Sequence, residues 1–169
     1  MTFDVVVEVP KGSRNKYEWD PEVGALRLDR QLFTATRYPG DYGFIPGTQG
    51  EDGDPLDVLV VLDEATFPGC HINCRAVGLL DMSDEHGGDA KLLAVPDADP
   101  RVTWREVGDV PGYVLEEIRH FFNIYKDLEP GKTTEVGSWR SRDHAEREIS
   151  AARARFAGSG ASAGGSPSA

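Results

Sequence analysis

Three aspartates, Asp52, Asp54 and Asp57, place three carboxylates within six residues of the chain. Like charges this close repel one another, so a fold that holds them together calls for a cation among them. Carboxylate oxygens are hard ligands, which favour Mg²⁺, Mn²⁺ or Ca²⁺ over softer metals. Gly53 allows a tight turn, and Pro55 stiffens the chain just before an apolar, strand-like run. The sequence therefore predicts a metal site on a loop that a strand anchors.

A second charged cluster contains Asp84, Asp89 and Lys91. At the start of a strand, residues two apart share one face, so Asp89 could hold a metal while Lys91 reaches an anion bound to it. Lys16 and Glu18 repeat this spacing of a cation and an anion. The alternative is a solvated loop with surface ion pairs, which contribute little to stability.

Further side chains could bind a phosphoryl group, because Tyr, Lys and Arg are its usual donors. Tyr42 lies in an expected turn, Tyr125 and Lys126 close an expected helix, and Arg30 follows a short strand. Taken singly, each Tyr could equally be a core ring with a polar tip, and Arg30 a surface charge. His86 lies in a Gly-rich loop, where an exposed side chain is more common than a catalytic one.

The composition limits the class of partner. With 169 residues, the chain suits one domain, and its net charge of −11 argues against nucleic acid or an anionic membrane surface. A small anionic substrate stays possible, because bridging metal ions reverse the local field. The sequence has no apolar stretch of transmembrane length and no basic signal-peptide start, so we expect a cytoplasmic protein.

Short apolar or alternating segments predict a series of strands. These segments are 3–9, 16–19, 25–28, 57–62, 72–80 and 91–95. Two helical patterns follow, the first after Asp109 and Pro111 and the second from about Ser141. The inner face of the second helix is expected to carry Ala145, Ile149, Ala152 and Phe156. Many short strands followed by two helices are typical of a small β-barrel with helices packed against it.

Cys70 and Cys74 raise the possibility of zinc, but no further ligands follow at a matching spacing. On a strand these two residues share one face, so we expect buried, reduced thiols.

Together these residues resemble the soluble, Mg²⁺-dependent inorganic pyrophosphatases of the single-domain (family I) type. The resemblance covers about residues 3 to 155, and the segment 52–57 matches the family signature in full. The other matching motifs are Lys16 to Glu18, Tyr38 to Pro46, Asp84 with Glu85, Asp89 and Lys91, and Tyr125 with Lys126. The run around His86 is similar to the actinobacterial branch, and Asp41 stands where many members carry Asn.

The resemblance implies an α+β fold, mainly β: a small five-stranded, OB-like closed β-barrel with two C-terminal helices packed against it. The catalytic domain would span residues 1–156. Residues 157–169, dominated by Gly, Ser and Ala, would form a disordered tail. The family's bacterial members assemble as homohexamers, so a homohexamer is expected here.

The implied activity is hydrolysis of inorganic pyrophosphate to two orthophosphates by a metal-activated water, with several Mg²⁺ ions per site and Mn²⁺ or other divalent ions as possible substitutes. Asp54 would take the proton of the water, and Asp89 is the weaker candidate for that role. The implied metal ligands are Glu8, Glu18, Asp52, Asp57, Asp84 and Asp89. The implied phosphate-binding residues are Lys16, Arg30, Tyr42, Lys91, Tyr125 and Lys126.

Two other classes of protein share part of the pattern. In an EF-hand, Asp52, Asp54 and Asp63 would take loop positions one, three and twelve, but the required Gly falls at position two and a strand follows. An oligonucleotide-binding barrel would have the expected fold. The acidic balance, and the lack of a basic stripe with aromatic residues, argue against it.

Overall fold

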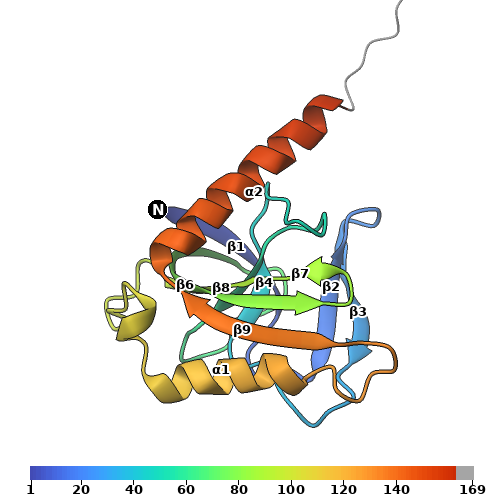
Figure 1. The fold of residues 1–169 in the computed structure, drawn as a ribbon, viewed down its shortest axis with the longest axis horizontal. Coiled ribbons are helices and arrows are strands. Elements are labelled where there is room, and N and C mark those ends of the chain that lie inside the picture. The colour runs from blue at the N-terminus through green and yellow to red at the C-terminus, as the bar shows by residue number, and fades with distance from the viewer. Residues whose placement is uncertain (163–169) are drawn as a thin grey trace, which may run out of the picture.

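A closed ring of strands forms the centre of the molecule in the computed structural model, which describes residues 1–162 (Figure 1). Going round the ring, the strands pair in the order β1-β4-β5-β8-β6, and β6 pairs back onto β1. The pair β5–β8 is parallel, and the other ring pairs are antiparallel. The predicted fold is confirmed: a mainly β chain with helices, built on a five-stranded, OB-like ring.

The elements in chain order are β1 (Thr2–Val9), β2 (Asn15–Asp20), β3 (Ala25–Gln31), β4 (Asp41–Phe44), β5 (Asp57–Val60), β6 (His71–Asp84), β7 (Gly87–Gly88), β8 (Lys91–Pro96), a 3-10 turn (Val107–Asp109), α1 (Gly112–Ile124), β9 (Thr134–Arg140) and α2 (Arg142–Ser162). Strands β7 and β9 extend the sheet beyond the ring by pairing with β6. Strands β2 and β3 form a separate hairpin.

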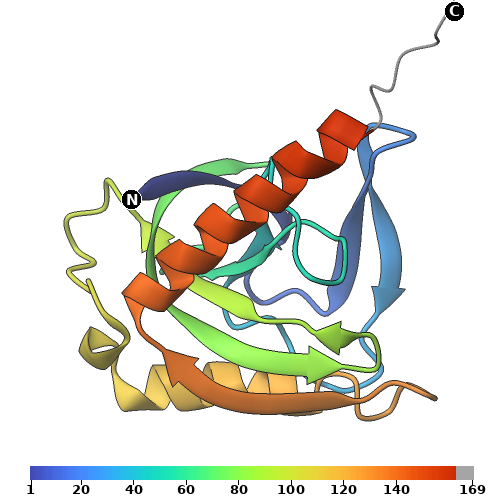
Figure 2. The ribbon, with the colours of Figure 1, turned by 45° about the horizontal axis from the view of Figure 1, so that its top comes forward.

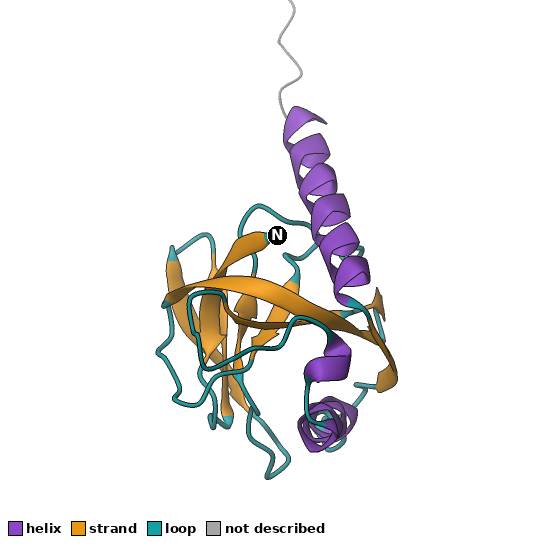
Figure 3. Cartoon of the chain, turned by 90° about the vertical axis from the view of Figure 1, so that its left-hand side faces the viewer, coloured by secondary structure: helices purple, strands orange, loops and turns teal. Residues whose placement is uncertain are grey.

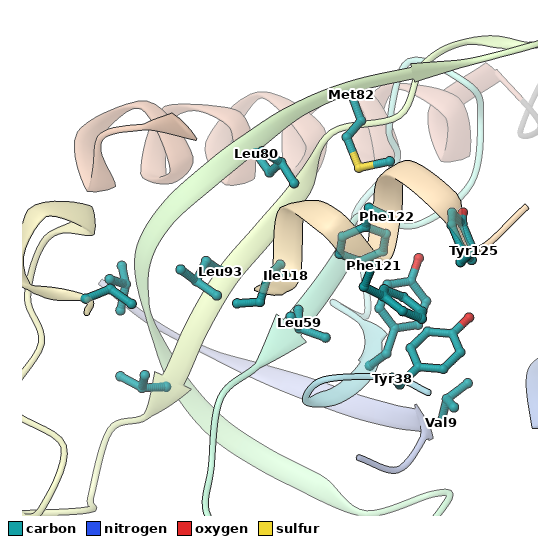
Figure 4. Close-up of a cluster of buried hydrophobic side chains, with 14 of the residues drawn as sticks. Val9, Tyr38, Leu59, Leu80, Met82, Leu93, Ile118, Phe121, Phe122 and Tyr125 are labelled. Carbon is teal, nitrogen blue, oxygen red and sulfur yellow. The ribbon is translucent and has the colours of Figure 1, made fainter. Parts of the chain in front are cut away.

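Two clusters of buried side chains hold the helices against the ring. Successive residues of a strand point to opposite faces, so Leu59 of β5 enters one cluster while Val58 and Val60 enter the other. The first cluster includes Ile118, Phe121 and Phe122 of α1, as Figure 4 shows. The second includes Ala145, Ile149 and Ala152 of α2. The apolar run that follows the acidic loop is therefore buried on both faces.

Helix α1 begins at Gly112 and lies beside β9, whereas α2 begins at Arg142 and runs across β6 (Figures 1 and 2). Both starts agree with the sequence prediction. Among the described residues, no helix has the length and apolar character needed to cross a membrane.

The expected inner face of α2 is correct at three positions and wrong at the fourth. Ala145, Ile149 and Ala152 are fully buried, but Phe156 is 51% exposed. Figure 3 shows the reason: the end of α2 extends past the strands, so it has no barrel surface to cover. The helix continues to Ser162, whereas the sequence suggested a tail from Ala157. The rest of that tail lies outside the described residues.

Three strands differ from the expected pattern. The segment 41–44, expected as part of a turn, forms strand β4. A Cβ atom at Gly43 would lie 1.9 Å from the Val6 carbonyl oxygen, so only glycine allows β1 and β4 to pair there. Strand β6 runs on to Asp84, and β9 forms between the two helices. The longer β6 carries Asp84 toward the site described next.

Candidate active site

A cleft of about 830 Å³ opens where the β2–β3 hairpin faces the ends of the ring strands and of α1. Its lining contains every side chain that the sequence analysis proposed for the site. These are Glu8, Lys16, Glu18, Arg30, Tyr42, Asp52, Asp54, Asp57, Asp84, Asp89, Lys91, Tyr125 and Lys126. The acidic loops, separated in sequence by about thirty residues, therefore share one cavity.

Parallel strands β5 and β8 bring the two acidic loops together. Asp57 is the first residue of β5, Lys91 is the first residue of β8, and Val58 is in register with Leu92. The starts of parallel neighbours lie at the same edge of a sheet, so Asp57 and Lys91 must meet there. A turn with Gly53 at a φ of 96° folds the preceding loop, and the Asp54 N–H donates to Asp52 Oδ1 at 3.1 Å.

Lys91 forms the centre of the charge arrangement. Its Nζ lies 2.5 Å from Asp57 Oδ2 and also donates to Asp89. Burial acts to lower the pKa of Lys91, but the charges of Asp57 and Asp89 outweigh it and hold the pKa above its ordinary value. The side chain is 4% exposed, so this ammonium stays charged only because two carboxylates contact it.

Several carboxylates in the cleft bind protons more tightly than isolated carboxylates do. Burial raises the pKa of Glu8 to about 7, although a 2.7 Å hydrogen bond from the Trp19 N–H acts in the opposite direction. Burial and then the charge of Asp52 raise the pKa of Asp54. Burial also raises the pKa of Asp89, with Lys91 opposing it. Among the described residues, eight Asp or Glu and five Lys or Arg side chains line the cleft, so it holds more negative charge than its own cations neutralise.

Asp84 differs from these carboxylates, because its partners favour the ionised form. It accepts hydrogen bonds from the His86 N–H at 2.8 Å and from Lys126 Nζ at 3.1 Å. Burial acts to raise the pKa of Asp84, but these two donors outweigh burial and leave the pKa below its ordinary value. Asp84 is thus ionised across the neutral range.

The sequence left open whether Tyr42 and Tyr125 are core rings or phosphate-binding donors, and their positions suit both roles. Their rings are buried in the cluster under α1, where Tyr125 lies 5.2 Å from Phe121 between ring centroids (Figure 4). Both residues also line the cleft. Burial raises the pKa of each phenol well above its ordinary value, so both stay protonated and can donate hydrogen bonds. They are core rings and cleft donors at once.

Arg30 lines the cleft and is not a free surface charge. Its Nη2 donates to Glu129 Oε2 at 3.0 Å, its Nε donates to Glu129 Oε1, and its Nη1 donates to Asp29. Neither Asp29 nor Glu129 stood out in the sequence as a site residue. Asp29 was recognisable as a charged neighbour of Arg30, but Glu129 lies 99 residues away and gave no local signal.

Asp41 has a structural role. Its side chain is fully buried and accepts hydrogen bonds from the Lys11 N–H at 2.8 Å and from the Thr66 N–H at 3.0 Å. These bonds tie two loops to the start of β4. Asp41 is not among the described residues that line the cleft, whereas its neighbour Tyr42 is.

His86 lines the cleft, but its side chain is 76% exposed and lies 3.7 Å from Glu85. Both thiols are free, but the expected burial holds only for Cys74, because Cys70 lies just before β6 and is half-buried. Strand β5 follows the loop 52–57, where an EF-hand would place a helix.

The described carboxylates of the cleft could bind a divalent metal ion by their chemistry, although they are not arranged around one as they stand. Within residues 1–162, no three His, Cys, Asp or Glu side chains lie in an arrangement that would hold an ion as they stand, and Lys91 contacts both Asp57 and Asp89. The chemistry of the lining nevertheless fits, because its candidate ligands are all carboxylates and its carboxylates outnumber its Lys and Arg side chains. The site suits hard divalent cations.

The same lining carries Lys, Arg and Tyr donors of the kind that bind phosphoryl oxygens. The described lining includes no Ser or Cys that could attack a substrate. Carboxylates and cations that share one cleft, without a protein nucleophile, are typical of a metal-dependent hydrolase that transfers phosphoryl groups to water.

Comparison with known proteins specifies the class further. A sequence model described as inorganic pyrophosphatase matches residues 5–157. The inorganic pyrophosphatase of Streptomyces coelicolor is 60% identical over 157 residues, which is 92% of this chain and 96% of that protein. That of Leifsonia xyli is 54% identical and covers 94% and 98% of the two chains. The crystal structure of the Thermus thermophilus inorganic pyrophosphatase has a TM-score of 0.90 at 51% identity and covers 92% and 91% of the chains.

The chain belongs to the inorganic pyrophosphatase family. It is accordingly an inorganic diphosphatase, an enzyme of a metal-dependent family, as the resemblance in its motifs implied.

Proposed function

We propose that the cleft is where this enzyme hydrolyses pyrophosphate to two orthophosphates, with Mg²⁺ as its usual metal. The observation that carries the proposal is that all the acidic and basic side chains expected for this reaction line one cavity. A diphosphate carries several negative charges, so a cleft in which carboxylates outnumber Lys and Arg side chains would bind it with the help of metal ions that reverse the local field.

The proposed metal ligands are the carboxylates of the two loops and of the facing strands. They are Glu8, Glu18, Asp52, Asp57, Asp84 and Asp89. Bound divalent ions would lower the pKa of a coordinated water and neutralise phosphoryl oxygens. Mn²⁺ or another divalent ion could replace Mg²⁺, because these ions share a preference for oxygen ligands.

Asp54 is the proposed general base. It lies beside the proposed ligand Asp52, and its raised pKa brings it closer to neutrality, where proton transfer is most efficient. Asp89 is the second candidate for this role, but its contact with Lys91 leaves it less free to accept a proton.

The remaining cleft residues are proposed to bind and orient the two phosphates. They are Lys16, Arg30, Tyr42, Lys91, Tyr125 and Lys126. Phosphoryl transfer depends mainly on positioning and on stabilising charge, so fixed donors around both phosphates provide much of what the reaction needs. Lys91 and the two phenols are buried, which fixes their geometry before the substrate binds.

A phosphate-release assay tests the proposal. Pyrophosphate with Mg²⁺ should yield orthophosphate rapidly, addition of EDTA should abolish release, and ATP should be hydrolysed far more slowly. Unchanged release in EDTA, or equal rates on ATP and pyrophosphate, would reject the assigned chemistry.

We further propose a homohexamer in the cytoplasm, based on the expectation for bacterial members of the family. Light scattering after size-exclusion chromatography should give about six times the 18.5 kDa of one chain. A monomer mass at micromolar concentration would contradict this assembly.

A further inference from the structure

Arg30 is held by carboxylates on two edges of its guanidinium. Glu129 accepts from Nε and Nη2, whereas Asp29 accepts from Nη1. Asp29 and Arg30 line the cleft, but Glu129 is not among the described residues that do. The Glu129 edge therefore faces the protein, and the Asp29 edge faces the cavity.

The two carboxylates differ in their exposure. The Glu129 side chain is 4% exposed, whereas that of Asp29 is 31% exposed. A buried carboxylate that loses its cationic partner pays a large desolvation cost, so the contact with Glu129 is hard to break. Water can replace the partly exposed Asp29 carboxylate beside Arg30, so the contact between Arg30 and Asp29 is easier to exchange.

Glu129 also connects Arg30 to a second proposed phosphate ligand. Its own N–H donates to the Lys126 carbonyl oxygen at 2.9 Å, which closes the turn that follows α1. Lys126 in turn reaches Asp84 across the cleft. The single side chain of Glu129 thereby fixes strand β3, which carries Arg30, against the turn that carries Lys126.

The geometry of the pair suits a fixed support. A planar guanidinium and a carboxylate that share two parallel hydrogen bonds have little rotational freedom. Burial acts to lower the pKa of Arg30, but the hydrogen bonds and charge of Glu129 raise it, and the net pKa lies above its ordinary value. The guanidinium thus keeps both its charge and its direction.

We propose that Glu129 is a positioning residue for pyrophosphate hydrolysis: it holds the inner edge of Arg30 so that the outer edge, now on Asp29, is presented to a phosphoryl group. A phosphoryl oxygen replaces the exposed Asp29 carboxylate at Nη1, while the contact with Glu129 stays in place. This inference rests on the proposed role of Arg30 in binding substrate.

Four proteins test the proposal: the wild type, Glu129→Gln, Arg30→Lys and the double variant. Glutamine keeps the shape of Glu129 but loses its charge and one acceptor, so Arg30 is no longer fixed. We expect the KM for magnesium pyrophosphate to rise about tenfold, with a smaller change in kcat. The double variant should be no worse than Arg30→Lys alone, because lysine cannot form the two-point contact with Glu129.

Asp99→Asn is the matched control. It removes the same charge from another two-point pair, in which Arg101 Nε and Nη2 donate to Asp99 Oδ1 and Oδ2 at 2.9 and 2.8 Å, and neither residue is among the described residues that line the cleft. This control should leave KM unchanged. Near-UV circular dichroism and the melting temperature of each variant show whether it is folded.

The outcomes separate the two proposals. Loss of wild-type turnover on pyrophosphate would reject the proposed function itself. Normal wild-type turnover with an unchanged KM for Glu129→Gln, or fully additive effects in the double variant, would overturn the positioning role alone. If Glu129→Gln does not fold, Glu129→Asp replaces it, since the shorter acid cannot keep both hydrogen bonds, from Nε and Nη2 of Arg30, that Glu129 accepts; its KM must rise if the proposal holds.

Discussion

At the scale of single residues, Lys91 keeps the acidic cleft folded before any cation binds. It contacts Asp57 and Asp89 and lies 5.8 Å from the centroid of the Tyr42 ring. Without this ammonium the two carboxylates would repel each other in a poorly hydrated site. Lys91 therefore stabilises the fold, and we propose that it also binds the substrate.

Replacing Lys91 should make stability depend on metal. Lys91→Met leaves Asp57 and Asp89 without a counter-charge, so we expect a loss of about 3 kcal/mol in EDTA. Mg²⁺ should restore part of this loss, because it can neutralise the same carboxylates. Urea unfolding with and without Mg²⁺ measures both effects, and equal losses in the two buffers would contradict the explanation.

Replacing Asp54 separates catalysis from folding. Asp54→Asn removes the proposed base and should lower kcat by at least about a hundredfold. Its melting temperature should not fall, because Asp54 is an exposed residue whose raised pKa shows that its charge does not stabilise the folded state. Asp63→Asn is the control, since Asp63 is an exposed aspartate outside the described cleft lining. Near-normal phosphate release by Asp54→Asn would remove Asp54 as the base.

Glu8 should make the metal-free protein less stable as pH rises. Its pKa is raised from 4.5 to about 7, so the folded state binds a proton more tightly than the unfolded state does. Stability is therefore lost as pH increases from about 4.5 to 7, by roughly 3 kcal/mol for this group. Glu8→Gln should remove this part of the slope in urea titrations done in EDTA; an unchanged slope would contradict the burial of an ionisable Glu8.

At the scale of elements, α2 supports the loop that carries the acidic motif. The Gln49 N–H donates to the Ala152 carbonyl oxygen at 3.0 Å, and Arg155 Nε donates to the Gln49 carbonyl oxygen at 2.8 Å. The helix thus holds the chain just before Asp52, while β5 holds it just after Asp57. A loop fixed at both ends keeps its carboxylates in place.

Two truncations test this support. Deleting everything after Phe156 keeps both contacts with Gln49, so stability and turnover should change little. Deleting everything after Ile149 removes both contacts and the buried Ala152, so the melting temperature should fall by several degrees. A large loss from the first deletion would show that the end of the chain is structural.

At the scale of the whole molecule, the charge distribution links stability to metal. A net charge of −11 is concentrated in part around one cleft, where several carboxylates resist ionisation. A ligand that binds only the folded state stabilises it by mass action. Mg²⁺ at about a hundred times its Kd should add about 2.7 kcal/mol.

Differential scanning fluorimetry checks this directly. The melting temperature should rise steadily with Mg²⁺ concentration and should not rise with an equal ionic strength of NaCl. Identical melting in EDTA and in millimolar Mg²⁺ would contradict a metal site in this cleft.

The sequence predicted which side chains gather in one cleft better than it predicted the connections of the fold. The segment 52–57 and the pair Asp89 and Lys91 are local patterns, so their chemistry was visible without coordinates. The partnership of Arg30 with Glu129 was not visible, because nothing in the sequence marks residues 99 apart as neighbours. Strand β9 was missed because its residues are exposed or only partly buried and a glycine interrupts its pattern.

The ring and the cleft both need residues from the two halves of the chain, which determines when a chain made on the ribosome can become active. Arg30 emerges early during synthesis, but its support at Glu129 and the donors Tyr125 and Lys126 emerge about a hundred residues later. Strand β6 must also wait for β8 and β9 before its pairing is complete. A nascent chain released before about residue 130 therefore lacks one wall of its catalytic pocket, and turnover begins only when nearly the whole polypeptide has been made.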